Sequence, residues 1–282
     1  SSESLSSSSD TEIASSMFTP LSANASQSSI QGHTPTHSPA SKQHPPCTRA
    51  PASLDSPWPP ALTLPALCRR HRIDVLFNAD PFGSPLGGKR RVTLVHDLYF
   101  KTIPEQIGWR ATLTTDFIFR LMMAGSDRVT CVSEATRRDL ARFYPSAASK
   151  SLTIHSDSTL KVDPEAVNGP SPVAGPYILA VGNATSNKNF TLLGKAFAVL
   201  GKARPDLHVV HVGRDDAEEI GNVLDDPELK ARLIRLSGID DGQLAELYRH
   251  AACLCVPSTY EGFCLPVLEA QQLGCPVVCS NR

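Results

Sequence analysis

Short apolar runs alternate with helix-like stretches along most of the chain beyond residue 60. In the first half, the apolar runs are residues 73–77, 92–95, 128–132 and 152–154. A second set occupies residues 177–182, 207–212, 232–236, 251–256 and 277–279. Between the runs, apolar residues recur at helical spacing, as Leu113, Phe117 and Leu121 do. Short strands separated by helices are typical of parallel sheets with crossover connections, so the pattern predicts an α/β fold.

One stretch between the two sets of strands departs from this alternation. Residues 161–176 are rich in Pro, Gly, Ser and Asn, a composition typical of a linker between domains. We therefore predict two Rossmann-like domains that face a cleft. The first would occupy residues 61–160 and the second residues 177–282.

The segment before the first strand has a different composition. Residues 1–60 are dominated by Ser, Pro, Thr and Ala, with few aliphatic residues and no sustained periodicity. Such a segment buries too little apolar surface to offset chain entropy, so it is predicted to be disordered. It has neither a basic start followed by an apolar core nor an apolar run long enough to cross a bilayer. The sequence thus argues against a secretory signal and a membrane span, and it predicts a cytoplasmic protein.

Charge and cysteine usage narrow the classes of partner. The 282 residues are 41% hydrophobic, enough for real cores, and the formal net charge is −1. With no basic stripe interleaved with aromatic residues, nucleic-acid binding is not favoured. The eight cysteines include the pairs Cys253-x-Cys255 and Cys275-x3-Cys279. Both pairs lie in apolar runs without a histidine cluster, so they are interpreted as small core residues of a protein in a reducing compartment, not as metal ligands.

The segment from Ser258 to Glu269 sets two carboxylates on either side of a loop that turns into a helix. Glu261 is expected in the loop and Glu269 in the first helical turn. Pro266 is expected at the first helical position, where its fixed φ and missing N–H are tolerated. The N–H groups of such a loop and of a helix N-terminus form an electropositive concavity for phosphates or sugar hydroxyls. The arrangement suits the binding of a nucleotide sugar.

This segment resembles the E-x7-E signature of the retaining glycosyltransferases of GT-B fold, of the glycosyltransferase family 4 type that includes mannosyl- and rhamnosyltransferases. The similarity extends over residues 260–270 and 273–281 and departs at Cys264, where a glycine is usual. The resemblance implies that Glu261 contacts the donor sugar near the reacting carbon and that Glu269 holds the nucleotide ribose. The loop residues that it adds to the donor site are Gly262, Phe263, Cys264 and Leu265.

The strand at residues 177–182 is followed by a loop with features of a phosphate site. Gly182 permits close approach of the backbone, and Lys188 supplies a positive charge at the entrance of the next helix. Lys188 and Asn189 resemble the Lys-Asn pair of the family's phosphate loop, and both are predicted to bind the donor. An arginine often precedes that lysine in mannosyltransferase-like members, whereas Asn187 stands here. Taken without the resemblance, the glycine and the lysine indicate a turn and a solvated charge.

In the first half, the strand at residues 92–95 runs directly into His96 and Asp97. The strand at residues 128–132 runs into a helix for which Ser133 is the expected N-cap. Both strands should end at the same edge of a parallel sheet, where open α/β folds bind ligands. His96 resembles the family's histidine near the donor sugar and the departing phosphate, and it is predicted to be catalytic together with Glu261. The alternative is that Asp97 caps a turn and His96 packs against a loop.

The resemblance covers residues 61–282 and omits both ends of the usual two-domain enzyme. We therefore expect two incomplete GT-B domains with apolar surface exposed where sheet edges and core are uncovered.

The function implied is transfer of a hexose from a nucleotide diphosphate sugar to a carbohydrate or lipid-linked acceptor, with retention, without a metal or cofactor. A lipid-linked acceptor would place the protein peripherally at the inner face of the membrane. Three alternatives stay open. The chain could be an inactive nucleotide-sugar- or carbohydrate-binding remnant of the family or a sugar-nucleotide 2-epimerase of the same fold. A nicotinamide dehydrogenase is less favoured, because no G-x-G-x-x-G follows any predicted strand.

Overall fold

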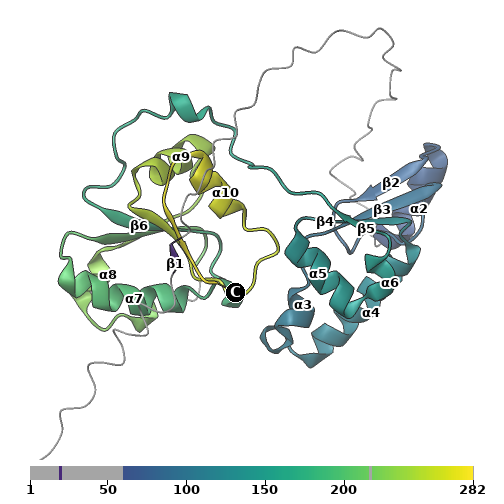
Figure 1. The fold of residues 1–282 in the computed structure, drawn as a ribbon, viewed down its shortest axis with the longest axis horizontal. Coiled ribbons are helices and arrows are strands. Elements are labelled where there is room, and N and C mark those ends of the chain that lie inside the picture. The colour runs from purple at the N-terminus through teal and green to yellow at the C-terminus, as the bar shows by residue number, and fades with distance from the viewer. Residues whose placement is uncertain (1–18, 21–59, 216–217, 282) are drawn as a thin grey trace, which may run out of the picture.

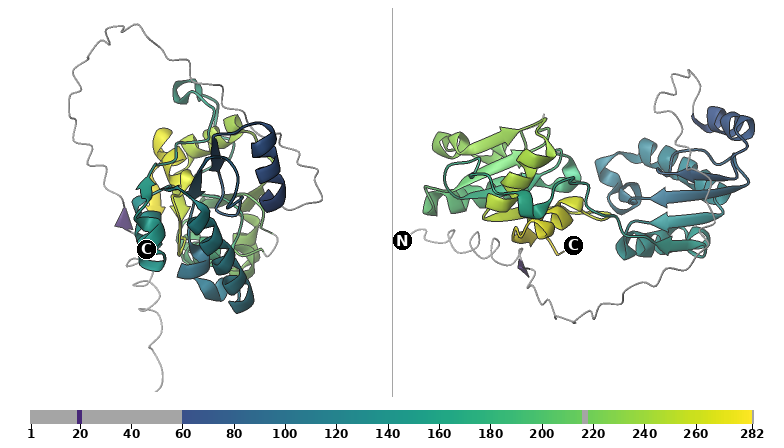
Figure 2. Two further views of the ribbon diagram at one scale, coloured as in Figure 1. Left: turned by 90° about the vertical axis from the view of Figure 1, so that its right-hand side faces the viewer. Right: turned by 90° about the horizontal axis from the view of Figure 1, so that it is seen from above.

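The structure is a computed structural model that describes residues 19–20, 60–215 and 218–281. The described residues form two α/β bodies joined by an extended segment (Figure 1, Figure 2). The predicted disorder of residues 1–60 lies outside the described residues, apart from Thr19, Pro20 and Pro60.

The first body contains a parallel four-stranded sheet. Its order is β2 (Val75–Asn78), β3 (Arg90–Val95), β4 (Arg128–Cys131) and β5 (Ser151–Thr153). Its helices are α2 (Pro60–Arg70), α3 (Tyr99–Thr102), η1 (Pro104–Gln106), α4 (Trp109–Gly125), α5 (Glu134–Phe143) and α6 (Pro145–Ala148). Every strand predicted in this half is confirmed, with no end shifted by more than two residues.

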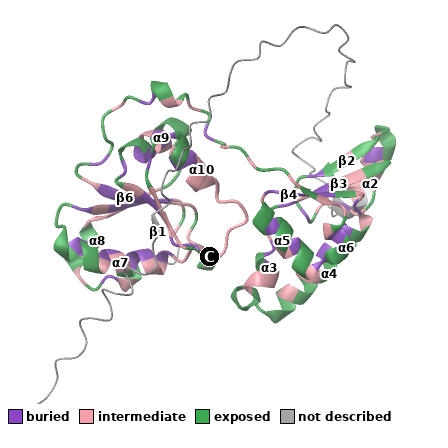
Figure 3. Ribbon diagram, in the orientation of Figure 1, coloured by how far each residue is buried: buried purple, intermediate pink, exposed green. Residues whose placement is uncertain are grey.

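One face of this sheet carries the core of the first body. Phe119 and Met122 of α4 and Leu140 of α5 pack against Val95 and Val129 of the sheet. The predicted helix α4 is confirmed, but its buried face is not the one that the four-residue repeat suggested. The side chains of that repeat, Leu113, Phe117 and Leu121, are exposed (Figure 3).

Apolar side chains are also exposed on the other face of the same sheet. Val75 and Phe77 of β2, Leu152 of β5 and Ile154 are all more than 40% accessible to solvent. The exposed apolar surface that the sequence led us to expect is thus confirmed for this body.

The second body contains a six-stranded sheet in which every neighbouring pair is parallel except the pair at one edge. The order is β1 (Thr19–Pro20), β10 (Val277–Cys279), β9 (Cys253–Val256), β6 (Tyr177–Val181), β7 (His208–Val212) and β8 (Leu233–Leu236). The helices are η3 (Ser186–Lys188), α7 (Phe190–Ala203), η4 (Gly221–Val223), α8 (Pro227–Ala231), α9 (Asp241–His250) and α10 (Leu265–Gln272). The two parallel sheets confirm the predicted α/β class with two Rossmann-like bodies.

Alternating side chains of β6 supply the two cores of the second body. Tyr177 and Leu179 face α9 and α10, whereas Ile178 and Ala180 face α7 and α8. Because both faces are covered, β6 is a continuous apolar run and not an alternating one. The segment between β5 and β6, which contains η2 (Pro164–Ala166), adds Val167 and Val173 to the core on the α9 side. The part of the chain expected to be a linker is therefore packed on this body.

The start of α10 corrects two expectations. The helix begins at Leu265, so Pro266 holds its second position and not its first. Glu269 is the fifth helical residue, and the first turn contains no acid. The physical reason lies in Cys264, whose left-handed backbone (φ 67°) turns the loop sharply and starts the helix one residue earlier than the proline signal suggests.

Over the described ranges, none of the helices combines the length and the hydropathy needed to cross a bilayer.

Candidate functional site

Most of the predicted site residues lie at the carboxyl ends of parallel strands, whereas Leu265 and Glu269 lie in α10. Residues 182–189 follow β6 and residues 257–264 follow β9, in the second body. In the first body, residues 96–98 follow β3, and α5 begins just after β4. The structure brings these four segments together, as the sequence led us to expect.

An ion pair links the two loops of the second body. Lys188 Nζ lies 2.7 Å from Glu261 Oε1, and the two side chains are only 20% and 23% exposed. Ser258 Oγ donates a hydrogen bond of 2.7 Å to the same carboxylate oxygen. Partial burial makes such a charge pair less screened than one on the open surface. Lys188, predicted to bind phosphate, and Glu261, predicted to contact the sugar, are therefore neighbours.

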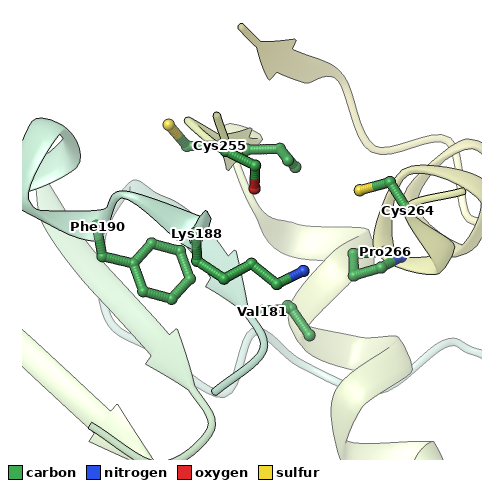
Figure 4. A pocket seen from close by; sticks show the side chains of 8 residues that line it. Val181, Lys188, Phe190, Cys255, Cys264 and Pro266 are labelled. Atoms are coloured by element: carbon green, nitrogen blue, oxygen red, sulfur yellow. The ribbon is translucent and has the colours of Figure 1, made fainter. Parts of the chain in front are cut away.

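Lys188 also lines a small pocket at the start of α10. Figure 4 shows its side chain extended toward Cys264 and Pro266, with the Phe190 ring beside the start of the side chain and Val181 beside its end. The pocket thus joins a cation, a helix N-terminus and an apolar wall at one place.

Backbone and amide contacts hold the two loops of the second body against each other. Asn189 has a left-handed backbone (φ 53°) and donates its side-chain N–H to the Pro257 carbonyl over 3.2 Å. The Asn187 carbonyl accepts the Thr259 N–H over 2.8 Å. Gly182 has φ 124°, which favours glycine, and its carbonyl is 2.8 Å from a ring nitrogen of His211. Asn187 and Asn189 thus position the loops, and the donor contact expected of Asn189 stays a prediction.

Gly262 lies directly against the first body. A Cβ at this position would be 2.0 Å from the His96 carbonyl oxygen, so only a glycine fits. The Gly262 carbonyl accepts hydrogen bonds from Ser133 Oγ over 2.5 Å and from Thr136 Oγ1 over 3.2 Å. Ser133 also accepts the Thr136 N–H, which confirms it as the N-cap of α5.

Tyr260 adds a second connection between the two bodies. Its hydroxyl donates to Asp139 Oδ2 over 2.9 Å and accepts the Leu98 N–H over 3.1 Å. Sequence reasoning missed Tyr260, Thr136 and Asp139, because their partners lie more than a hundred residues away along the chain. A tyrosine immediately before Glu261 was the available signal.

His96 and Asp97 make the contacts of the alternative interpretation while lying at the site. A His96 ring nitrogen is 2.8 Å from the Ala79 carbonyl, and Asp97 accepts the Tyr99 N–H over 3.2 Å as a turn cap. The pKa of Asp97 is raised above its usual value, mainly by burial and in smaller part by the Glu261 charge. The Tyr99 N–H and His96 oppose this increase. Asp97 also lies beside the loop after β9, since a Cβ added at Gly262 would be 3.1 Å from Asp97 Cβ.

Glu269 lies behind the loop, near the segment that connects the two bodies. It is 6% exposed, and both carboxylate oxygens accept hydrogen bonds. Tyr248 Oη donates to Oε2 over 2.9 Å, and Thr159 Oγ1 donates to Oε1 over 3.2 Å. A buried carboxylate that is fully hydrogen-bonded can be held in one orientation.

The remaining predicted donor residues form the turn into α10. The Phe263 ring lies 6.1 Å from the His155 ring, centroid to centroid, and Leu265 is the first residue of the helix. Burial raises the pKa of the Cys264 thiol to about 11, with a further increase from Glu261. The thiol is therefore neutral at physiological pH and behaves as a small apolar group in the pocket wall.

Among the described residues, no three His, Cys, Asp or Glu side chains are grouped so that they could hold a metal ion. Independence of a metal stays a prediction.

Comparisons with known proteins assign a family match to each half of the chain. Residues 22–156 match the model of Glycosyltransferase Family 4, and residues 165–282 match that of Glycosyl transferases group 1. O-antigen chain mannosyltransferase B of Escherichia coli is 27% identical over 218 residues, which cover 74% of this chain and 57% of that protein. The chain thus spans little more than half the length of this relative.

Solved structures of glycosyltransferases share the fold, and two of them illustrate the match. WaaG, a glycosyltransferase involved in lipopolysaccharide biosynthesis, aligns with a TM-score of 0.57 at 19% identity, covering 75% of this chain and 60% of that one. Sucrose-phosphate synthase from Thermosynechococcus elongatus aligns with a TM-score of 0.56 at 23% identity, covering 76% of this chain and 59% of that one. The chain therefore has the GT-B glycosyltransferase fold, with a family 4 match in its first half and a group 1 match in its second.

Proposed function

We propose that the protein transfers a hexose from a nucleotide diphosphate sugar to a carbohydrate or lipid-linked acceptor, with retention of configuration and without a metal ion. The observation that carries this proposal is the Lys188–Glu261 ion pair, 2.7 Å long and largely buried. It lies where two loops of the second body meet the first body. A cation and an acid held together there match the two charges that develop when a sugar leaves a diphosphate.

Lys188 would stabilise the departing diphosphate. A positioned charge in a water-poor cleft is an effective way to stabilise a leaving group, because it needs no reorganisation during the reaction. The N-terminal ends of α7 and α10, which follow the two loops, would add their dipoles. These groups would supply the charge compensation for which other enzymes use a metal ion.

Glu261 would face the sugar, and Glu269 would bind the ribose of the nucleotide. As the bond to the diphosphate lengthens, the anomeric carbon gains positive character, and the Glu261 carboxylate stabilises that charge. His96, whose carbonyl touches Gly262, would lie beside the same sugar. The name of the Escherichia coli relative makes mannose the first hexose to test.

The experiment is a transfer assay with radiolabelled mannose and glucose donors of both GDP and UDP, with and without EDTA. Lys188→Met and Glu261→Gln should each lower transfer by about 100-fold, a loss typical of removing one group that stabilises transition-state charge. Lys195→Met, which changes an exposed lysine on α7, is the matched control and should be unaffected. Magnetic resonance of the product would report the anomeric configuration.

Transfer that is indifferent to both substitutions would remove these residues from the mechanism. Inversion of the anomeric centre would refute retention, and loss of transfer in EDTA would refute metal independence.

The proposed lipid-linked acceptor requires contact with a membrane surface, and α4 offers a suitable face. Trp109, Leu113 and Phe117 are 69%, 60% and 63% exposed and recur every four residues, so they share one side of the helix. Arg110 and Arg120 lie on the same helix and would favour anionic lipids.

Sedimentation with vesicles of anionic and of neutral lipids tests this contact. We expect Phe117→Ser to reduce binding to anionic vesicles, since it removes apolar surface that would enter the lipid. Leu200→Ser, at a residue 45% exposed on α7 of the second body, is the matched control and should bind as the unaltered protein does. Equal binding of both variants would exclude α4 as the contact.

A further inference from the structure

Glu269 is anchored from inside the second body by one phenol. Tyr248, on α9, has no exposed surface, and its hydroxyl donates to Glu269 Oε2 over 2.9 Å. An ionised carboxylate at 6% exposure is costly unless its oxygens are hydrogen-bonded. The phenol supplies that bond at the oxygen that faces the core.

The Tyr248 hydroxyl is fixed both in position and in protonation state. Tyr248 is packed in the cluster that contains Ala245, Leu247 and Leu254, so its ring has one orientation. The helix that carries it begins with a capping box formed by Asp240 and Gln243. Burial, and then the Glu269 charge, raise the pKa of the Tyr248 phenol, so it stays a donor throughout the physiological range.

The other carboxylate oxygen lies beside the segment that joins the two bodies. Oε1 accepts a hydrogen bond of 3.2 Å from Thr159, an exposed residue of the segment between the two bodies. The two oxygens of Glu269 therefore have different surroundings, with Oε2 held inside and Oε1 at the edge. Because Oε2 is held among core side chains, Oε1 is the oxygen better placed to accept a hydroxyl from outside the core.

From this geometry we propose that Tyr248 is the positioning residue that aims Glu269 Oε1 at a ribose hydroxyl of the donor. The proposal rests on the proposed function, in which Glu269 binds the ribose. Without the phenol, the carboxylate loses its inner partner and can rotate about its last torsion to find another. The hydrogen bond to the ribose hydroxyl then weakens, whereas contacts to the diphosphate stay unchanged.

The test combines removal of the Tyr248 hydroxyl from the protein with removal of one ribose hydroxyl from the ligand. Calorimetry on the 282-residue chain would measure the affinity for UDP and GDP, and for the 2′-deoxy and 3′-deoxy forms of whichever binds. In the unaltered protein, loss of the relevant hydroxyl should weaken binding by about 10-fold, the size expected for a charge-assisted hydrogen bond. In Tyr248→Phe this penalty should fall below about threefold.

Tyr177→Phe is the matched control. Tyr177 is equally buried in the same body, but its hydroxyl donates to the Leu247 carbonyl over 2.7 Å and not to Glu269. A loss of stability alone would weaken binding of the ribose and deoxyribose forms alike and leave their ratio unchanged. We therefore expect Tyr177→Phe to keep the 10-fold ratio of the unaltered protein.

The outcomes separate the two claims. If the roughly 10-fold ratio of affinities for the ribose and deoxyribose forms persists in Tyr248→Phe, the positioning role is overturned. The same holds if Tyr177→Phe loses the ratio to the same extent. Either result leaves the proposed function standing. No discrimination by the unaltered protein overturns the ribose role of Glu269, and the inference with it. If Tyr248→Phe does not fold, the variant that also carries Glu269→Gln replaces it. Tyr248→Phe should add no further change to Glu269→Gln, and an added change contradicts the proposal.

Discussion

Replacement of Gly262 by alanine tests the contact between the two bodies at the site. The added Cβ would lie 2.0 Å from the His96 carbonyl oxygen and 3.1 Å from Asp97 Cβ, whereas real Cβ contacts essentially never fall under 3.0 Å. The clash involves backbone, so relief requires the loop and the first body to separate by about 1 Å, a misplacement that can cost about 100-fold in rate. The Gly262 carbonyl would also lose its contacts with Ser133 and Thr136, each worth about 1 kcal/mol.

Two assays measure this displacement. Release of nucleoside diphosphate from a nucleotide sugar should fall by about 100-fold, whereas nucleoside diphosphate affinity should stay within about twofold, because the proposed nucleotide contacts belong to the second body. Hydrogen exchange at Leu98, whose N–H donates to Tyr260, reports the contact without any turnover. That exchange should become faster in Gly262→Ala.

Gly242→Ala is the control. Gly242 is an exposed residue of the first turn of α9, where a Cβ would be 3.2 Å from an Asp240 oxygen, so alanine should leave both readouts unchanged and add helix propensity. A folded Gly262→Ala protein with unchanged Leu98 exchange and turnover within about threefold of the unaltered protein would refute the reasoning.

Two further predictions concern stability, each measured by urea unfolding. Although burial alone would raise it, contacts from Lys101, Tyr144 and Arg120 lower the pKa of Asp116 from 3.8 to about 2. Asp116 should therefore contribute about 2 kcal/mol to the free energy of unfolding at pH 7. Asp116→Asn should remove this contribution, which in the unaltered protein disappears as the pH falls from about 4 to 2. A variant whose stability is as sensitive to acid as that of the unaltered protein contradicts this. Cys264→Gly should be neutral or stabilise by up to about 1 kcal/mol, because Cys264 has a left-handed backbone (φ 67°); a clear loss would show that the thiol's packing outweighs that strain.

The strands could be predicted from the sequence because each is a short apolar run with a clear boundary. Their ends could not. The expected strand from Ile73 begins only at Val75, because the Ile73 N–H donates to Cys68 and closes the end of α2. The strand expected from Ala251 begins at Cys253, since Ala251 is the C-cap of α9. Local hydrogen bonds at helix ends thus compete with the apolar pattern for the same residues.

The site likewise has features that the sequence predicts and features that it does not. The loop positions of Lys188 and Glu261 follow from strand ends in a parallel sheet, but the ion pair between them depends on two loops 73 residues apart. No motif in the sequence singles out Tyr248, and its bond to Glu269 requires the packing of α9 beside α10. Pairings of this kind are properties of the folded chain, so no local pattern contains them.

The loop from Tyr260 to Gly262 has a consequence for engineering. Its first and third residues join the two bodies, and its middle residue forms the ion pair of the site. A designer who exchanges this tripeptide to alter the ion pair also changes the contact through which the two bodies meet. The ion pair and the contact between the bodies share one short stretch of sequence, so variant libraries built here should be screened for ligand binding and for stability together.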